Sequence, residues 1–561
     1  MFCIKASVAS AAVLVLLATC DAEAATTTLG ADAAKTCAGL VGAMPALAIG
    51  VKSGGIVIDS AKLEAATAMA VAEKGPTPAA RITPANPEFC KVLGHIEPID
   101  PKAPAINFEI NLPSSWNGRS VQYGGGGFNG VLITGLGLPP SMPFDAPSPL
   151  MRGFVTYGTD SGHQNKPGEE VQTFAANAEA FENFAHLSYK KVRDVAVAVM
   201  KKAYGETPEK LYFMGSSEGG REALTMAQRY PRDFDGIFAR VPVINWVGLQ
   251  HAGWRGGLAT MGEGYIRREQ VEYVDDAVLT ACDAADGIRD GRIANPVACK
   301  ALFDVTKLAC KPGQVGGVCL TPAQIKAVQK LHAPYKFPWP LANGLDDYPG
   351  WGVSGEATPA SGPTGGWNAW WLGTTPPANP PAPTNGIAWV YGSGGMRHVF
   401  MREPNGDVTK YEPAKNRARI EEVSALMDST NPNLAAFASR GGKLIVLEHM
   451  ADYAQSPYAG IRYVQAVQKT MGASKARQFL RLYTAPGVDH VGSGAPANVD
   501  MLAVLTDWVE KGKQPGKLTV VEQIVAPKPE VDRALPLCEW PQWPKYKLGD
   551  FNLATSFECA R

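Results

Sequence analysis

A serine between two glycines, in the segment 215–219 (GSSEG), has the neighbours that a catalytic nucleophile needs. Glycine at both ends lets a strand turn sharply into a helix, which leaves the serine exposed beside backbone N–H groups. The five-residue pattern alone has many false matches, but an apolar run at 211–214 precedes it directly and a helix-forming segment at 220–224 follows. This context predicts that Ser217 is a nucleophile.

A serine nucleophile needs a base to take its proton and a carboxylate to orient that base. After a turn of this kind the acid and then the base follow along the chain. We assign the base to His490, in a loop after a predicted strand at 479–484, and the acid to Asp452, after a predicted strand at 442–448. The histidines that follow the serine are His251, His332, His398, His449 and His490.

Two residues are alternatives for these roles. Asp489 is closer in sequence to the base, but adjacent residues rarely point at the same imidazole. His449 is a rival base, which we rank lower because it lies in the loop of the acid. For His490 itself the alternative is a surface-loop histidine without a catalytic role.

The negative charge of a tetrahedral intermediate needs hydrogen-bond donors. The N–H of Glu218, directly after the nucleophile, is the first donor expected, and a glycine-rich loop after an earlier strand supplies the second. The loop at 124–127 fits this role, with Gly126 as first choice and Gly125 as second. A phosphate-binding loop is the rival, but no Lys-Ser/Thr pair follows and no long helix begins there.

The segment 282–293 (CDAADGIRDGRI) concentrates carboxylates and turn glycines. Calcium binds carboxylate and backbone carbonyl oxygens in flexible loops, so we expect a structural Ca2+ here. The expected ligands are the side chains of Asp283, Asp286 and Asp290 and the carbonyls of Ile288 and Arg292. The spacing is not that of an EF-hand, and a pair of solvated Asp-Gly turns held by a disulfide is the alternative.

The elements that position these residues follow the order strand, helix, strand, tight turn, helix, which indicates a parallel sheet with crossover helices. Strands are predicted at 106–112, 119–122, 153–160, 211–214, 442–448 and 479–484, and helices at 175–204, 221–229, 456–471 and 501–511. The first two strands flank a turn at 113–118. Between about 245 and 435 the order breaks down in a proline-rich, cysteine-containing stretch. We therefore predict an α/β fold of the α/β-hydrolase type, with a catalytic core at 25–245 and 436–561 and an inserted lid domain at 246–435 that carries the calcium-type loop.

Residues 1–24 have the features of an export signal. Lys5 supplies the positive end, an apolar stretch follows at 11–18, and Ala22 and Ala24 form a small-x-small cleavage site. We expect a secreted or periplasmic protein. Lipid attachment at Cys20 is the alternative, although Thr19 is unusual before a lipidated cysteine.

Ten cysteines occur, of which Cys3 and Cys20 fall in the signal, leaving an even set of eight. An even set in an exported chain indicates disulfides. Pairing by proximity gives Cys37 with Cys90, Cys282 with Cys299, Cys310 with Cys319, and Cys538 with Cys559. A zinc site is the rival, but the chain has neither a Cys-x-x-Cys nor a His-Glu-x-x-His motif.

The balance of 53 basic and 53 acidic side chains over 561 residues gives no indication of a nucleic-acid or polyanionic partner, and we expect none. No apolar run after the signal is long enough to cross a bilayer. The composition indicates neither an organic cofactor nor an oligomeric state.

Over nearly the whole exported part, the chain resembles the tannase and feruloyl esterase family. The resemblance rests on an ordered set of segments: 122–130 (QYGGGGFNG), 160–164 (DSGHQ), 215–221 (GSSEGGR), 227–236 (AQRYPRDFDG) and 282–293, with Asp452 and His490. It implies an α/β-hydrolase core with a large lid, a structural calcium in the acidic loop, and hydrolysis of aromatic acid esters. It also places the triad on Ser217, Asp452 and His490.

The chain departs from this family at two linked positions. The family usually has cysteines just before the nucleophile and just after the histidine, joined as a disulfide, and Ser216 and Val491 stand there. Because both cysteines are absent together, the resemblance still implies an intact triad. It leaves open which substrate the protein takes and how rigid the histidine loop is. A third departure is Glu448, where relatives often have histidine; here His449 follows.

We expect a secreted serine esterase that acts on feruloyl, galloyl or related aromatic esters through an acyl-enzyme. A terephthalate monoester hydrolase is the alternative, as are a peptidase or acyltransferase with the same triad and a non-catalytic binding module on the same fold. In the lid, Trp367, Trp370 and Trp371 could stack on an aromatic ring, and Arg397 could pair with a carboxylate. Packing and surface charge are the alternatives for these four residues.

Overall fold

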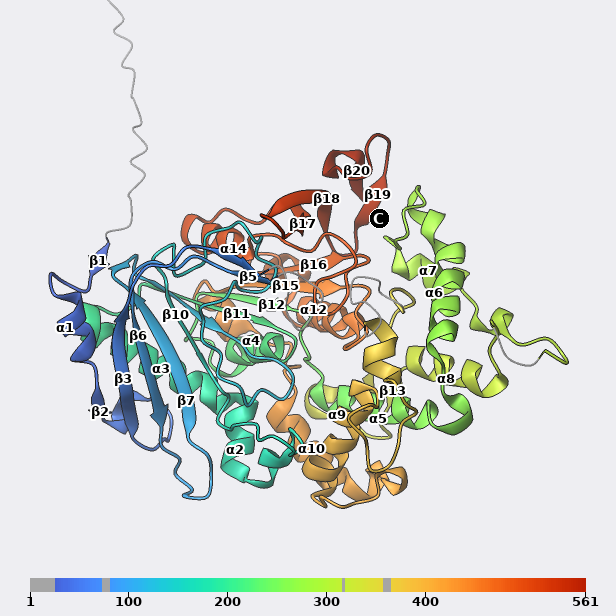
Figure 1. The fold of residues 1–561 in the computed structure, drawn as a ribbon, viewed down its shortest axis with the longest axis horizontal. Coiled ribbons are helices and arrows are strands. Elements are labelled where there is room, and N and C mark those ends of the chain that lie inside the picture. Colours follow the sequence, from blue (N-terminus) through green and yellow to red (C-terminus); the bar gives the residue numbers. More distant parts are fainter. Residues whose placement is uncertain (1–25, 73–80, 315–317, 357–364) are drawn as a thin grey trace, which may run out of the picture.

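In a computed structural model, a twelve-stranded sheet runs through the centre of the molecule (Figure 1). The structure describes residues 26–72, 81–314, 318–356 and 365–561. The strand order is β17 (Leu518–Ile524), β18 (Glu530–Glu539), β16 (Leu480–Ala485), β15 (Lys443–His449), β12 (Gly236–Arg240), β11 (Lys210–Ser216), β9 (Arg119–Tyr123), β10 (Val155–Thr159), β7 (Ile106–Pro113), β6 (Phe89–Ile96), β3 (Ile56–Glu64) and β2 (Gly42–Met44). The strands from β16 to β10 are parallel to their neighbours, and the outer strands pair antiparallel.

Both faces of the parallel part are covered by helices, because alternate side chains of a strand point to opposite faces. Phe213, Ile237 and Leu444 share a buried cluster with α4 (Glu218–Arg229) and α12 (Pro457–Met471). Tyr212, Phe238 and Ile445, each one position away, share another with α14 (Met501–Lys511). This confirms the predicted α/β class.

The connection between β7 and β9 differs from the expected simple turn, because β10 lies between these two strands in the sheet. Within the connection, β8 (Ser115–Trp116) pairs instead with β1 (Thr27–Thr28). The predicted helix at 175–204 is also divided: α2 (Ala178–Glu182) and a π-helical turn, η3 (Asn183–Leu187), precede α3 (Ser188–Tyr204).

The chain between β12 and β15 contributes no strand to the large sheet in its described parts. It forms α5 (Trp246–Ala259), α6 (Arg268–Cys282), α7 (Pro296–Leu302), α8 (Pro322–His332), α9 (Ile387–Gly394) and α10 (Arg417–Met427), with a small pair of strands, β13 (Tyr335–Lys336) and β14 (Asp347–Tyr348). In Figure 1 α6, α7 and α8 lie at the end of the molecule opposite β2 and β3, and α10 lies lower, near the middle. Trp254 and Trp389 share one buried cluster with the strand residue Phe213, so the lid is packed directly onto the core.

Four disulfides join the cysteine pairs that proximity predicts: Cys37–Cys90, Cys282–Cys299, Cys310–Cys319 and Cys538–Cys559. None of the described helices has the length and apolar character that a bilayer span requires. The predicted signal at 1–24 and the alternative lipid site at Cys20 lie outside the described residues.

Candidate active site

Ser217 lies at the tight turn between β11 and α4. Its backbone φ is +61°, a positive value that non-glycine residues rarely adopt. A Cβ atom on Gly215 would lie 2.0 Å from the Gly219 carbonyl oxygen, and one on Gly219 would lie 2.6 Å from the carbonyl oxygen of Gly125. Packing therefore requires both glycines of the motif, and the turn holds the serine at the carboxyl edge of the sheet.

His490 connects this serine to a carboxylate. Its Nε2 lies 2.9 Å from Ser217 Oγ, and its Nδ1 lies 2.7 Å from Asp452 Oδ2. The other oxygen of the buried Asp452, Oδ1, accepts hydrogen bonds from the amides of Ala454 (2.7 Å) and Gln455 (2.9 Å). Because an ionised carboxylate only accepts, Nδ1 carries the proton and Nε2 is left to accept one from the serine. The structure thus brings together the three residues assigned to the triad.

The alternative acid and base have other contacts. His449 is fully buried with its Nδ1 2.6 Å from the Asp489 carbonyl oxygen, and burial together with the charge of Arg240 holds its pKa well below the usual range. The carboxylate of Asp489 accepts hydrogen bonds from the backbone amides of Val491, Gly492 and Ser493. Asp489 therefore shapes the loop that carries His490.

A second carboxyl group, that of Glu448, lies beside the acid. Its Oε2 accepts a hydrogen bond from Gln455 Nε2 (2.9 Å), and the same nitrogen lies 3.2 Å from Asp452 Oδ2. Burial raises the pKa of Glu448 well above its ordinary value. Burial thus disfavours a second negative charge next to Asp452.

The predicted oxyanion donors differ in whether their amides are available. In the described part of the chain, the Glu218 amide has no protein acceptor. The Gly125 amide donates to Glu222 Oε2 (2.9 Å) and the Gly126 amide to Asn129 Oδ1 (2.5 Å). Glu218 is thus a free donor, whereas the N–H groups of Gly125 and Gly126 already have acceptors within the protein.

Sequence reasoning missed the buried network that holds this glycine-rich loop. Glu222, on α4, accepts hydrogen bonds from Asn129 Nδ2 (2.6 Å) and Tyr189 Oη (2.5 Å) as well as from Gly125. Burial raises the pKa of Glu222. In return the Gly219 amide donates to the Gly125 carbonyl (3.1 Å), so the nucleophile helix and the loop are joined from both sides. The sequence signal that could have revealed this network is a glutamate about one helical turn after the catalytic serine.

Aromatic side chains surround the imidazole. The ring of Trp370 is centred 6.2 Å from that of His490, and the ring of Tyr453 6.4 Å from it. Tyr391 lies 5.9 Å from Trp370 and 5.1 Å from Phe128, which belongs to the glycine-rich loop. Tyr391, Tyr453 and Phe128 were not predicted, because they come from three segments far apart in sequence.

Two of the three predicted tryptophans belong to the lid core instead. Trp367 is 3% exposed and packs 5.4 Å from His332. Trp371 is 1% exposed and packs edge-on against Trp351 at 4.7 Å. Their expected role in binding a substrate ring is therefore wrong, since a core side chain offers no free face.

The predicted role of Arg397 is also not supported. Its buried guanidinium forms an ion pair with Glu170, whose other oxygen lies 2.6 Å from His398 Nε2. The charge that a substrate carboxylate would need is already neutralised within the protein.

The acidic loop is folded around its own backbone. Asp283 accepts hydrogen bonds from the amides of Asp290, Gly291 and Arg292, and Asp286 from those of Ile288 and Ala294. Burial and neighbouring carboxylates raise the pKa of Asp286 and of Asp290 to about 6. Within the described residues, no three His, Cys, Asp or Glu side chains converge as a metal centre would require. The loop has the carboxylates that calcium prefers, but not in a coordinating arrangement.

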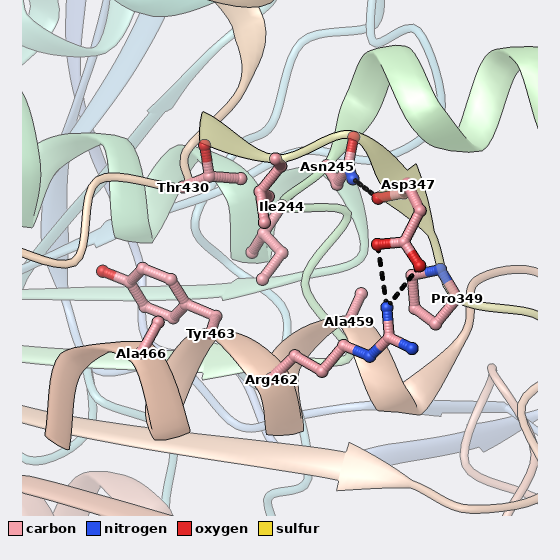
Figure 2. A pocket seen from close by; sticks show the side chains of 10 residues that line it. Ile244, Asn245, Asp347, Pro349, Thr430, Ala459, Arg462, Tyr463 and Ala466 are labelled. Atoms are coloured by element: carbon pink, nitrogen blue, oxygen red, sulfur yellow. Dashed lines mark hydrogen bonds and ion pairs between the residues drawn. The ribbon is translucent and has the colours of Figure 1, made fainter. Parts of the chain in front are cut away.

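Figure 2 shows a pocket of about 50 Å³ between α12 and the lid, lined by Ile244, Ala459 and Tyr463 and bordered by the ion pair of Arg462 with Asp347 (2.9 Å). No member of the triad lines it. It is a packing gap at the junction of lid and core and does not serve the candidate site.

Comparison with known proteins gives consistent matches along the chain. The family model described as tannase and feruloyl esterase matches residues 90–560. An uncharacterized esterase of Agrobacterium fabrum is 36% identical over 94% of each chain, and the mono(2-hydroxyethyl) terephthalate hydrolase of Piscinibacter sakaiensis is 31% identical over 88% of this chain and 89% of its own. The crystal structure of feruloyl esterase B from Aspergillus oryzae superposes with a TM-score of 0.73 at 23% identity, covering 91% of this chain and 98% of that one.

Proposed function

Because this chain belongs to the tannase and feruloyl esterase family and is a carboxylic ester hydrolase, we propose that it hydrolyses esters of aromatic acids, with Ser217 as nucleophile. The observation that carries this proposal is His490, which lies within hydrogen-bond distance of both Ser217 Oγ and the Asp452 carboxylate. The contacts match the roles of nucleophile, base and orienting acid.

In the first half of the reaction, His490 Nε2 takes the Ser217 proton while Oγ bonds to the ester carbonyl carbon. The tetrahedral intermediate collapses, the C–O bond to the alcohol breaks, and the imidazolium returns the proton to the departing alcohol. Water then gives a proton to the same nitrogen and attacks the acyl carbon. The bond from this carbon to Oγ breaks, the imidazolium returns the proton to Ser217 Oγ, and the acid is released. Asp452 stabilises the imidazolium at both stages.

The negative oxygen of each intermediate binds to the Glu218 amide, the free donor at the start of α4. For the second donor, Gly126 is the better of the two glycines. A Cβ atom on Gly126 would meet no atom within 4 Å, so its backbone borders open space, whereas one on Gly125 would lie 2.3 Å from Asn129 Oδ1. Gly126 would serve only by sharing its N–H between Asn129 and the substrate.

The aromatic part of the substrate is proposed to lie against Trp370 and Tyr453, the rings nearest His490. Ring stacking favours a planar acyl group such as a feruloyl or galloyl group over an alkyl group. A terephthalate monoester is the second candidate, supported by the similarity to the hydrolase from Piscinibacter sakaiensis.

The test is a panel of methyl ferulate, methyl gallate, a terephthalate monoester and alkyl esters of similar length, with wild-type protein and Ser217→Ala. We expect the aromatic esters to give the highest kcat/KM and the variant to be inactive. Hydrolysis that survives in Ser217→Ala would refute the triad, whereas equal rates on alkyl esters would refute only the aromatic preference.

We also propose that the acidic loop binds a structural Ca2+ after a local rearrangement. The proposal is supported by the buried Asp290 Oδ1, which has no hydrogen-bond partner among the described residues, and by the crowding of Asp283, Asp286 and Asp290. Metal analysis and melting with and without EGTA test it. A protein that carries no calcium and melts at the same temperature in both conditions would refute it.

Export is proposed as well, supported by the four disulfides and by the signal-like residues 1–24. Sequencing the N-terminus of the purified protein tests this. Cleavage near Ala25 supports export, a lipid-modified Cys20 indicates anchoring, and an intact Met1 contradicts both.

A further inference from the structure

Arg240 is the last residue of β12, the strand that lies between the nucleophile strand β11 and the acid strand β15. It is in register with Ser216 on one side and with Leu447 on the other. Its carbonyl oxygen accepts a hydrogen bond from the Ser217 amide (3.0 Å). The backbone of Arg240 is therefore fixed directly beside the nucleophile.

The side chain of Arg240 contacts the two catalytic loops from this position. Its Nε donates to Ser216 Oγ (2.8 Å), on the residue before the nucleophile. Its Nη1 lies 3.4 Å from the point that a Cβ atom on Gly492 would occupy, so the guanidinium packs against the loop that carries His490.

The charge of Arg240 faces the carboxylates of Asp452 and Asp489, which attract it. Burial has the larger effect and lowers the pKa of Arg240 to about 10, so the group remains a cation at neutral pH. The same charge helps to keep the neighbouring His449 neutral. One cation thus interacts with the acid of the triad and with the residue that shapes the histidine loop.

We propose that Arg240 is a positioning residue whose side chain joins the nucleophile turn to the loops that carry the acid and the base. These two loops already form one unit, since the Ala451 amide donates to the Val488 carbonyl (3.0 Å) and the Met450 amide to the Ala485 carbonyl (3.0 Å). The nucleophile turn comes from another strand, and the Arg240 side chain connects it to that unit. The role rests on the proposed triad.

The contacts of Arg240 join the same two loops as the cysteine pair that the family resemblance leads one to expect. At those positions Ser216 accepts the hydrogen bond from Arg240, and Val491, which is 59% exposed, is the direct neighbour of Gly492. A polar, non-covalent contact therefore stands where a covalent one would otherwise limit the movement of base against nucleophile.

The test compares Arg240→Met, Arg240→Lys and Ser216→Ala with wild type on the best aromatic ester, after titration of active sites with a fluorophosphonate. Arg240→Met should lower kcat per titrated site by about tenfold or more and change KM less than about twofold, because the triad is misaligned while the binding surface is kept.

The two milder variants separate charge from hydrogen bonding. Arg240→Lys should restore only part of the rate, and Ser216→Ala should lower kcat by about threefold, because each loses the hydrogen bond between Arg240 Nε and Ser216 Oγ. A purely structural role would reduce the titrated fraction of sites and leave kcat per site unchanged, which would overturn the inference. If Arg240→Met does not fold, wild-type kcat per site in both milder variants overturns it. Activity in Ser217→Ala refutes the triad instead.

Discussion

Replacement of Asp452 by asparagine tests whether the acid sets the tautomer of His490. Asp452 Oδ1 accepts hydrogen bonds from the amides of Ala454 and Gln455, so the asparagine carbonyl oxygen must take that position. Its NH2 group then faces His490 Nδ1, which must accept, and the imidazole proton moves to Nε2, opposite Ser217 Oγ. In this tautomer the base cannot take the serine proton.

Loss of the correct tautomer in a serine triad lowers kcat by about 10⁴, or ~5.5 kcal/mol of transition-state stabilisation. We expect this loss for Asp452→Asn, measured as initial rates on the best ester at pH 7, with KM close to wild type. The matched control is Glu448→Gln, which replaces the buried carboxyl beside the acid by an amide of the same size and should keep kcat within about threefold. An Asp452→Asn enzyme that retains more than about a tenth of wild-type kcat would refute the assignment of the acid.

Three further predictions concern the surroundings of the triad and the lid. Trp370→Ala should raise KM for aromatic esters about fivefold and leave KM for alkyl esters unchanged, because one ring contact is lost; equal effects on both would contradict the substrate proposal. Glu222→Gln places an NH2 group among three donors, so unfolding in urea should show a loss of about 1–3 kcal/mol with a lower kcat, and unchanged values would rule out the loop-holding role. Burial raises the pKa of Glu356 to about 8, so the folded state favours the protonated carboxyl. This group therefore stabilises the fold fully below about pH 4.5, and the stabilisation is lost as the pH rises through 8. The free energy of unfolding of Glu356→Gln, relative to that of wild type, should therefore be a few kcal/mol higher at pH 8 than at pH 5, as measured by urea unfolding. A difference that does not change with pH would show that Glu356 does not titrate in this window.

The positions of Ser217, Asp452 and His490 were predictable because each depends on local sequence. A glycine-flanked turn has a recognisable composition, and the acid and base each follow a continuous apolar strand, β15 or β16. Parallel strands bring their carboxyl ends to one edge, so the order along the chain is enough to place these residues together. The cysteine pairs were predictable for the same reason, since three of the four close loops of 9 to 21 residues.

The features that sequence missed depend on contacts between distant segments. A glycine-rich loop does not reveal that Asn129 and Glu222 occupy its amides, because the acceptor from α4 becomes its neighbour only in the folded sheet. Composition likewise does not distinguish Trp370 from Trp371, which are adjacent in a π-helical turn and face in different directions. Arg397 was misjudged because its partner, Glu170, lies 227 residues earlier in the chain.

The site is held by connections of unequal strength, and this decides where it can be perturbed. Backbone hydrogen bonds fix the acid loop to the base loop, and Glu222 fixes the glycine-rich loop to the nucleophile helix. Between these two halves lies β12, whose backbone contacts both: the Ser217 amide donates to the Arg240 carbonyl, and the Val241 amide donates to the Leu447 carbonyl (2.7 Å). Beyond the strand end, the Arg240 side chain contacts Ser216 and packs against the loop that carries His490. A change at this position therefore acts on the distance between Ser217 Oγ and His490 Nε2, so substitutions at the end of β12 should change the chemical step more than substrate binding.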